Sequence, residues 1–355
     1  MNKYLCLILP LMISLSACDK SSDDNKTIKN NYSLDSEPLA FTQWAMAYDQ
    51  EYYQQHNIDM DAHVHADELL TRYTGQGVKI AVIDSSINAD HIELESQIKS
   101  IASVHGEYSS SCVYPIDCTH GSAVAGIVAA KINQEGIRGF APSADVYFIQ
   151  MNLNSSVSDS EIIRAFELVE ENNIDVVVCS WGTGDVSPAV AVKIQQLQTT
   201  GRDGKGIIIF FATGNNSAEL PNDESMLPTV IGVGASDHEN KPSSYNSFGQ
   251  GLDLLAPGGR RFNLGISTIS EQDGYYRLAD DDSAFIGTSA AAPIAASLAA
   301  LLLEANPNLT FEQIYSVMTE SADKIGQRQY ENGFNQYNGF GKVNFDQALS
   351  AMKNM

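Results

Sequence analysis

Three residues whose side chains could cooperate in nucleophilic catalysis each stand where an apolar segment begins or ends. Asp84 closes the strand-like run 78–83, and His120 immediately precedes a run of small residues that is typical of a closely packed helix. Ser289 stands at the head of an apolar stretch, where the amides of a first helical turn would surround its hydroxyl. Aspartate, histidine and serine in this chain order form one known arrangement of a triad in which the serine attacks an acyl carbon.

Asn215 adds a hydrogen-bond donor to this set. It follows the apolar run 207–211, so its side-chain amide could stabilise a negative oxygen that develops during acyl transfer. A helix start at Ser289 would favour negative charge as well, because the helix dipole is positive there. Taken singly, Ser289 could be only a helix N-cap and Asp84 only a strand-end cap. The combination of the four residues therefore carries the catalytic hypothesis.

The elements that would position these residues alternate between strands and helices. Strand-like runs fall at 78–83, 146–150, 176–180, 207–212 and 230–235, and helical patterns fall at about 122–132, 158–172, 187–199, 289–304 and 310–321. Alternation of this kind predicts an α/β fold in which a mostly parallel sheet lies between helices. We expect Asp84 at the carboxyl edge of that sheet, where α/β enzymes bind their ligands.

Together, the four segments closely resemble the motifs of the subtilisin-like serine peptidases, the subtilase family. The aspartate motif corresponds to residues 84–86, the histidine motif to 120–122, the asparagine motif to 214–215 and the serine motif to 287–293. Ser86 and Ser122 replace a glycine and a threonine of the family motifs, and both changes leave the reacting atoms in place. The resemblance implies a subtilisin-like domain with three layers.

The resemblance also implies a serine endopeptidase that forms an acyl-enzyme. Ser289 would attack the peptide carbonyl, His120 would take and return the proton, and Asp84 would hold the imidazole ring. Asn215 would hold the oxyanion. The alternative is a catalytically silent lipoprotein that uses the same scaffold to bind peptides or protein partners.

Within the family, several segments lean toward the kexin and proprotein-convertase branch, namely residues 37–39, 43–44, 180–182, 303–310 and 338–341. The resemblance implies that Ser180, Trp181 and Gly182 form one wall of a cleft that pairs with the substrate backbone. It also implies that Asp185, with Asp223 nearby, recognises a basic side chain at P1, the substrate residue before the cleaved bond. A broad or apolar P1 preference is the open alternative.

A structural Ca²⁺ ion is a further implication of the resemblance, although the chemistry itself requires no cofactor. The segment after His120 has the spacing of the subtilisin calcium loop, which puts Asn133 at a liganding position and Glu93 at the position of a carboxylate ligand. Oxygen ligands of this kind suit Ca²⁺. The alternative for Asn133 is an ordinary turn residue.

The amino-terminal segment is typical of an exported lipoprotein. An apolar stretch leads into residues 15–18, which resemble a bacterial lipobox whose Cys18 would receive the lipid. We expect residues 1–17 to be a signal peptide, 18–36 a flexible polar tether and 37–355 the peptidase domain. The protein would be anchored in a bacterial envelope, on a periplasmic or cell-surface face. An ordinary signal peptide or a buried helix is the alternative for the apolar stretch.

The remaining cysteines divide into two groups. Cys112 and Cys118 lie close together in a polar loop before the candidate histidine, and an exported protein meets oxidising conditions, so we predict a disulfide between them. A metal site is the alternative, which the absence of a Cys-x-x-Cys pair disfavours. Cys179 lies in an apolar strand pattern and is expected to be a core residue.

Charge limits the partners that this protein can favour. The formal net charge of −23 disfavours nucleic acid and anionic membrane surfaces, so attachment to a membrane would depend on the lipid. We expect peptide or protein substrates and a monomer. The length of 355 residues, with 43% hydrophobic residues, is sufficient for one large core.

Overall fold

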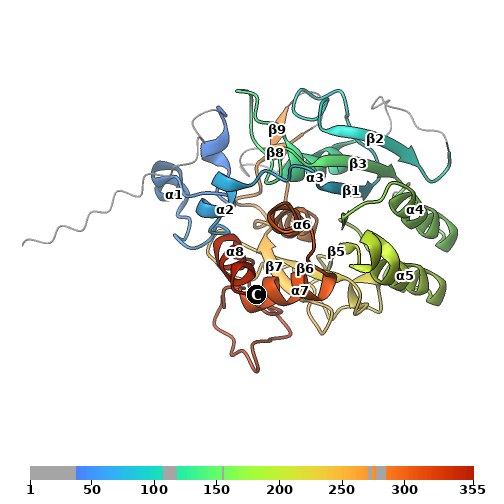
Figure 1. The fold of residues 1–355 in the computed structure, drawn as a ribbon. Helices are drawn as coiled ribbons and strands as arrows, with labels where there is room; N and C mark the ends of the chain where they lie inside the picture. Colours follow the sequence, from blue (N-terminus) through green and yellow to red (C-terminus); the bar gives the residue numbers. More distant parts are fainter. Residues whose placement is uncertain (1–36, 107–117, 154–155, 271–273, 277–284) are drawn as a thin grey trace, which may run out of the picture. The chain divides into compact units, whose positions relative to one another are not determined.

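The computed structural model describes residues 37–106, 118–153, 156–270, 274–276 and 285–355. All of these belong to the unit Asn31–Met355, which the internal contacts of the chain define. Strands and helices alternate along this unit, as Figure 1 shows.

A parallel sheet forms the centre of the described residues. Its seven strands lie in the order β2-β3-β1-β4-β5-β6-β7, and every neighbouring pair is parallel. The strands are β1 (Lys79–Asp84), β2 (Ile98–Ser103), β3 (Asp145–Gln150), β4 (Val176–Cys179), β5 (Ile208–Ala212), β6 (Ile231–Ser236) and β7 (Leu254–Pro257). A second, two-stranded antiparallel sheet consists of β8 (Thr268–Ile269) and β9 (Tyr275–Tyr276). The predicted α/β class is confirmed.

Two cores on opposite faces of the sheet explain why its central strands are apolar throughout. Even-numbered residues of β4 belong to the core that contains α3 (Thr119–Ala129) and α6 (Thr288–Ala305). Odd-numbered residues of β4 belong to the core that contains α4 (Asp159–Glu171) and α5 (Pro188–Gly204), which lie side by side in Figure 1. A sheet covered on both faces has no polar side, so alternation of polar and apolar residues disappears.

Shorter elements complete the described chain. They are η2 (Ala40–Thr42), α1 (Gln50–His56), α2 (Asp67–Arg72), η3 (Glu224–Met226), α7 (Phe311–Glu320) and α8 (Phe345–Lys353). Helix α7 begins with a reciprocal capping box between Thr310 and Gln313, which satisfies two amides of its first turn.

Helix α6 is the central helix of the first core. Fifteen of its 18 residues are buried, and its many alanines allow the strands to approach closely. Among the described residues it is the helix that is long and apolar enough to cross a membrane, and 83% of that stretch is buried inside the protein. We therefore interpret α6 as a core helix.

The structure differs from the predicted elements at the start of α3 and in elements that the pattern does not predict, among them α1, α2, α8, β8 and β9. Helix α3 begins at Thr119, earlier than the pattern predicts, so His120 lies within its first turn. No side-chain cap marks this start, because the N-cap residue Cys118 makes no capping hydrogen bond. The pattern also misses β2, whose residues are mostly half-buried, and β7, which has only four residues.

Candidate active site

Asp84 and His120 form a close pair at the carboxyl edge of the sheet. Asp84 ends β1 and is fully buried, and both of its carboxylate oxygens lie 2.9 Å from His120 Nδ1. The Ser85 amide donates to Asp84 Oδ1 at 2.7 Å, which holds the carboxylate in place. Because an ionised carboxylate only accepts hydrogen bonds, Nδ1 carries the proton, and Nε2 is then the basic nitrogen.

Ser289 lies in the first turn of α6, tied to the chain segment that leaves β4. Its hydroxyl donates to the Ser180 carbonyl at 3.2 Å, and its own carbonyl accepts from the Ser180 hydroxyl at 2.9 Å. Gly287 precedes the helix with φ at 119°, a conformation that favours glycine. These contacts present the Ser289 hydroxyl at the edge of the sheet rather than inside the core.

The side chain of Asn215 is oriented by Thr288, a residue whose role the sequence reasoning did not consider. Asn215 Oδ1 accepts from the Thr288 amide at 3.0 Å and from the Thr288 hydroxyl at 3.2 Å. The Thr288 hydroxyl also accepts from the Gly214 amide at 3.1 Å. Because Oδ1 is engaged in this way, the Nδ2 donor of Asn215 lies beside Gly287. A Cβ added at Gly287 would lie 3.0 Å from that nitrogen.

A cavity of about 350 Å³ opens beside Ser289, and we call it the Ser289 cavity. It is lined by residues 180–184, 212–216, 221, 223, 288 and 289. The wall residues expected from the resemblance, Ser180, Trp181 and Gly182, are all among them. Asp223 lines the cavity as well, whereas Asp185 does not; Asp185 is exposed and its backbone forms a bridge to Asn222.

Asp223, which lines this cavity, and its neighbour Glu224, which does not, are both buried acids. Burial raises the pKa of Asp223, the charge of Glu224 adds to this increase, and hydrogen bonds from Ser225 oppose it. Within the described part of the chain, neither carboxylate forms an ion pair. Sequence reasoning missed Glu224, because no motif distinguishes it from an ordinary surface acid.

Glu93 and Asn133 come close together with a third residue, Glu37, that sequence reasoning did not select. Glu37 Oε1 accepts from the amides of Asn133 and Gln134, each at 3.1 Å. Glu93 is fully buried; its Oε1 accepts from the Tyr275 hydroxyl at 2.9 Å, and its Oε2 has no partner among the described residues. Burial raises the pKa of Glu93 to about 7, and the charge of Glu37 contributes to the increase.

No group of three or more histidine, cysteine, aspartate or glutamate side chains that could hold a metal occurs in the described ranges. A calcium ion at this place would therefore need backbone or amide oxygens in addition to the two carboxylates.

Of the cysteines that the predictions concern, the structure describes Cys118 and Cys179. Cys18 and Cys112 lie outside the described residues, so the lipidation and the disulfide stay predictions. Cys118 is buried just before α3, the helix that contains His120, with its sulfur 3.3 Å from the Ser86 hydroxyl. Cys179 is fully buried in β4 with a free thiol, as expected for a core residue.

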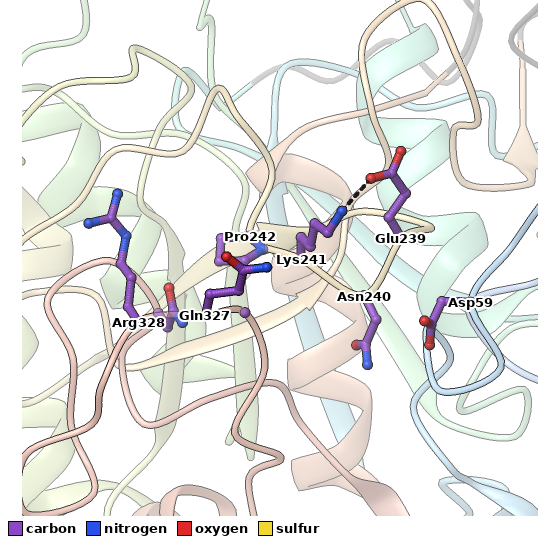
Figure 2. A pocket seen from close by; sticks show the side chains of 9 residues that line it. Asp59, Glu239, Asn240, Lys241, Pro242, Gln327 and Arg328 are labelled. Atoms are coloured by element: carbon purple, nitrogen blue, oxygen red, sulfur yellow. Dashed lines mark hydrogen bonds and ion pairs between the residues drawn. The ribbon is translucent and has the colours of Figure 1, made fainter.

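A larger cavity, of about 670 Å³, shares no residue with the Ser289 cavity (Figure 2). Lys241 and Glu239 point toward each other and form an ion pair at 2.7 Å, while Arg328 lies on the other side of the cavity. None of the candidate catalytic residues lines this cavity, whereas Ser289 and Asn215 line the smaller one. We therefore assign the chemistry to the smaller cavity.

The fold and the site define an α/β protein in which an aspartate–histidine pair, and a serine in the first turn of a buried helix, lie at the carboxyl edge of a parallel sheet. Residues 75–341 match the sequence model of the subtilase family, peptidase S8, and the chain belongs to this family. The family resemblance seen in the sequence is confirmed.

Curated relatives include subtilisin E of Bacillus subtilis, which is 32% identical over 263 residues, covering 73% of this chain and 64% of that protein. A calcium-dependent protease of Nostoc sp. is 28% identical over 331 residues, covering 82% of this chain and 48% of that protein. The chain thus spans about half to two thirds of the length of these relatives.

Among solved structures, a serine protease of Aeromonas sobria is similar in fold, with a TM-score of 0.72 at 21% identity. The similarity covers 90% of this chain and 68% of that one. A second structure, of the Aeromonas sobria protease in complex with its chaperone, has a TM-score of 0.73 and covers 67% of that chain.

Proposed function

We propose that this protein is a serine endopeptidase that hydrolyses peptide bonds through an acyl-enzyme. The observation that carries the proposal is the buried Asp84 carboxylate, which lies 2.9 Å from His120 Nδ1 at the sheet edge that also holds Ser289. His120 Nε2 takes the proton of the Ser289 hydroxyl during attack and later gives it to the leaving amine. Asp84 stabilises the imidazolium that forms between these steps.

The oxyanion forms beside the start of α6. Asn215 Nδ2 and the Ser289 amide are the proposed donors, and the positive end of the helix dipole adds to their effect. The hydrogen bonds from Thr288 to Asn215 Oδ1 support this assignment, because they leave the amide nitrogen as the free end of the side chain. A preorganised donor of this kind contributes roughly 10²-fold to 10³-fold to turnover.

A fluorophosphonate probe tests the proposal directly, because it reacts only with an activated serine. The wild-type protein is expected to be labelled, and Ser289→Ala is expected to remain unlabelled. Ser297→Ala is the matched control, since Ser297 lies in the same helix but donates to the Pro293 carbonyl inside the core. An unlabelled wild-type protein would favour the silent, peptide-binding alternative.

For the substrate, we propose a preference for a basic P1 side chain that Asp223 recognises. Asp223 lines the Ser289 cavity, and a buried carboxylate without a cationic partner is costly unless a ligand supplies the cation. Asp185 is exposed and outside this lining, so its proposed part is limited to the rim. Cleavage of a peptide library with mass-spectrometric readout would distinguish this preference from a broad one.

We further propose that Ca²⁺ binds between Glu93, Glu37 and the loop that contains Asn133. Two neighbouring buried carboxylates fit a divalent cation, and Oε2 of Glu93, which has no hydrogen-bond partner among the described residues, is a suitable hard ligand. The calcium-dependent proteases among the relatives are consistent with this proposal. Bound there, Ca²⁺ would neutralise the carboxylates and hold the amino-terminal arm, the segment that begins at Glu37, against the loop.

Export and lipidation at Cys18 remain part of the proposal on the strength of the sequence alone. Metabolic labelling with a fatty acid should mark the wild-type protein and not Cys18→Ser. Labelling of both proteins, or of neither, would contradict the lipid anchor.

A further inference from the structure

Glu224 makes an unusual pair of contacts beside the Ser289 cavity. It is fully buried at the start of η3, and its two carboxylate oxygens accept from the same residue, Thr183. Oε2 accepts from the Thr183 amide at 3.0 Å, and Oε1 accepts from the Thr183 hydroxyl at 2.8 Å. The carboxylate thereby holds both the backbone and the side chain of Thr183, which lines the Ser289 cavity.

This contact does not serve to cap η3, because Asp223 already does so. Asp223 Oδ1 accepts from the Ser225 amide at 3.1 Å and from its hydroxyl at 2.6 Å. Burial of a second carboxylate next to the first one is unfavourable, and in the described part of the chain no cation offsets it. The two hydrogen bonds from Thr183 satisfy both carboxylate oxygens, so the role of Glu224 lies in its contact with a residue that lines the Ser289 cavity.

The segment 182–184, which lines the Ser289 cavity and which we call the wall 182–184, has few other supports. Thr183 stands between Gly182 and Gly184, and Gly184 has φ at 78°, so the neighbouring residues contribute no side chain that could anchor the segment. An added Cβ at Gly182 would lie 3.0 Å from Asp223 Oδ2 and 3.9 Å from Glu224 Oε2. The wall therefore lies directly against both carboxylates.

We propose that Glu224 is a positioning residue for P1 recognition: by binding Thr183 through both oxygens, it holds the wall 182–184 where a cationic P1 side chain reaches Asp223. This inference rests on the proposed endopeptidase function and on Asp223 as the P1 carboxylate. The negative charge of Glu224 also adds to the field that the P1 cation meets, although Glu224 itself is engaged by Thr183.

The test compares two peptide substrates that differ only in P1, arginine or alanine, in the wild-type protein and in Glu224→Gln. Glutamine keeps the shape but offers one acceptor to two donors, so the wall loses one hydrogen bond and faces an amide donor. We expect kcat/KM for the arginine peptide to fall about 10-fold to 100-fold, mainly through KM, because a displaced wall misplaces the side chain. An alanine side chain does not reach Asp223, so kcat/KM for the alanine peptide should fall less than about threefold.

Thr183→Val is the second variant, and it keeps the test valid if Glu224→Gln does not fold. Thr183 is exposed, and valine removes only the hydroxyl donor to Glu224. The arginine-to-alanine selectivity should fall about tenfold, the value of one hydrogen bond to a charged group. In the double variant, the loss should be smaller than the product of the single losses, because both changes affect one contact.

Three results would overturn the inference, and they are distinguishable from one another. An unlabelled wild-type protein in the fluorophosphonate assay removes the proposed function and the inference with it. A labelled wild-type protein without arginine preference removes Asp223 as the P1 carboxylate. A wild-type protein that prefers arginine, with unchanged selectivity in folded Glu224→Gln and Thr183→Val, removes the role of Glu224 alone.

Discussion

Replacement of Asp84 by asparagine tests the proposed chemistry most sharply, because the structure determines how the new amide must lie. The Ser85 amide donates to Asp84 Oδ1 at 2.7 Å, and this position therefore requires an acceptor. Asparagine must place its carbonyl oxygen there and its NH₂ group at the Oδ2 position, 2.9 Å from His120 Nδ1. A donor at that distance repels a proton on Nδ1 and can donate to the unprotonated nitrogen, so it favours the tautomer with the proton on Nε2 over the one in which Nδ1 donates to the carbonyl oxygen at the Oδ1 position, also 2.9 Å away.

With a proton on Nε2, His120 cannot accept the proton of Ser289. The equivalent change in a related triad lowers kcat about 10⁴-fold, which corresponds to about 5.4 kcal/mol of transition-state stabilisation. We expect a loss of this size in kcat with little change in KM, since Asp84 is fully buried and does not line the Ser289 cavity.

Hydrolysis of a fluorogenic peptide, measured under saturating conditions, gives kcat for the variant. Asp90→Asn is the matched control, because it removes the same charge from an exposed residue on the same connection. Circular dichroism and the thermal midpoint establish that both variants fold. A loss of kcat below about 100-fold in folded Asp84→Asn would refute the reasoning, because it would mean that His120 does not depend on Asp84 for its tautomer.

Four further predictions concern the oxyanion donor, the turn before the serine, and two acids. Asn215→Ala should lower kcat about 10²-fold to 10³-fold, and an unchanged kcat would exclude Asn215 as a donor. Gly287→Ala adds a Cβ 3.0 Å from Asn215 Nδ2 at a φ of 119°, so kcat measurements should show a loss of at least about tenfold. Burial raises the pKa of Glu93 from 4.5 to about 7, so the folded protein keeps a proton that the unfolded chain releases. In denaturant titrations with a chelator, the free energy of unfolding should then fall as the pH rises from 4.5 to about 7. Added Ca²⁺ should remove this fall. Identical pH profiles with chelator and with Ca²⁺ would contradict a calcium site at Glu93. Burial also raises the pKa of Asp223, so KM for an arginine P1 peptide should increase as the pH falls through that raised pKa, with no such change for an alanine peptide.

The sequence anticipated the parts of the fold that have a strong local pattern. The buried runs that became β4 and β5 consist of apolar residues without interruption, and β1 contains four consecutive apolar residues at 80–83, so their existence and order could be predicted. The edge strand β2 is half-exposed and β7 is short, so neither has a pattern that stands out from a loop. Their place in the sheet depends on pairing with distant strands.

The region that we propose as a calcium site shows the same division. Glu93 and Asn133 could be selected because they keep the spacing of a known loop. Glu37 could not, because it comes from the amino-terminal arm, and its contact with the Asn133 amide joins segments 96 residues apart. Only the packing of that arm against the domain brings a second buried carboxylate near Glu93.

The sequence by itself determined which residues could carry out the chemistry, because each stands in a short motif whose own backbone presents the side chain. Asp84 ends a buried strand, and Gly287 allows the turn that places Ser289 at a helix start. Only the tertiary structure decided which acids line the Ser289 cavity. Asp223, and not Asp185, faces it because the segment after β4 lies against the loop after β5, and that contact depends on the packing of segments distant in the chain rather than on any local pattern.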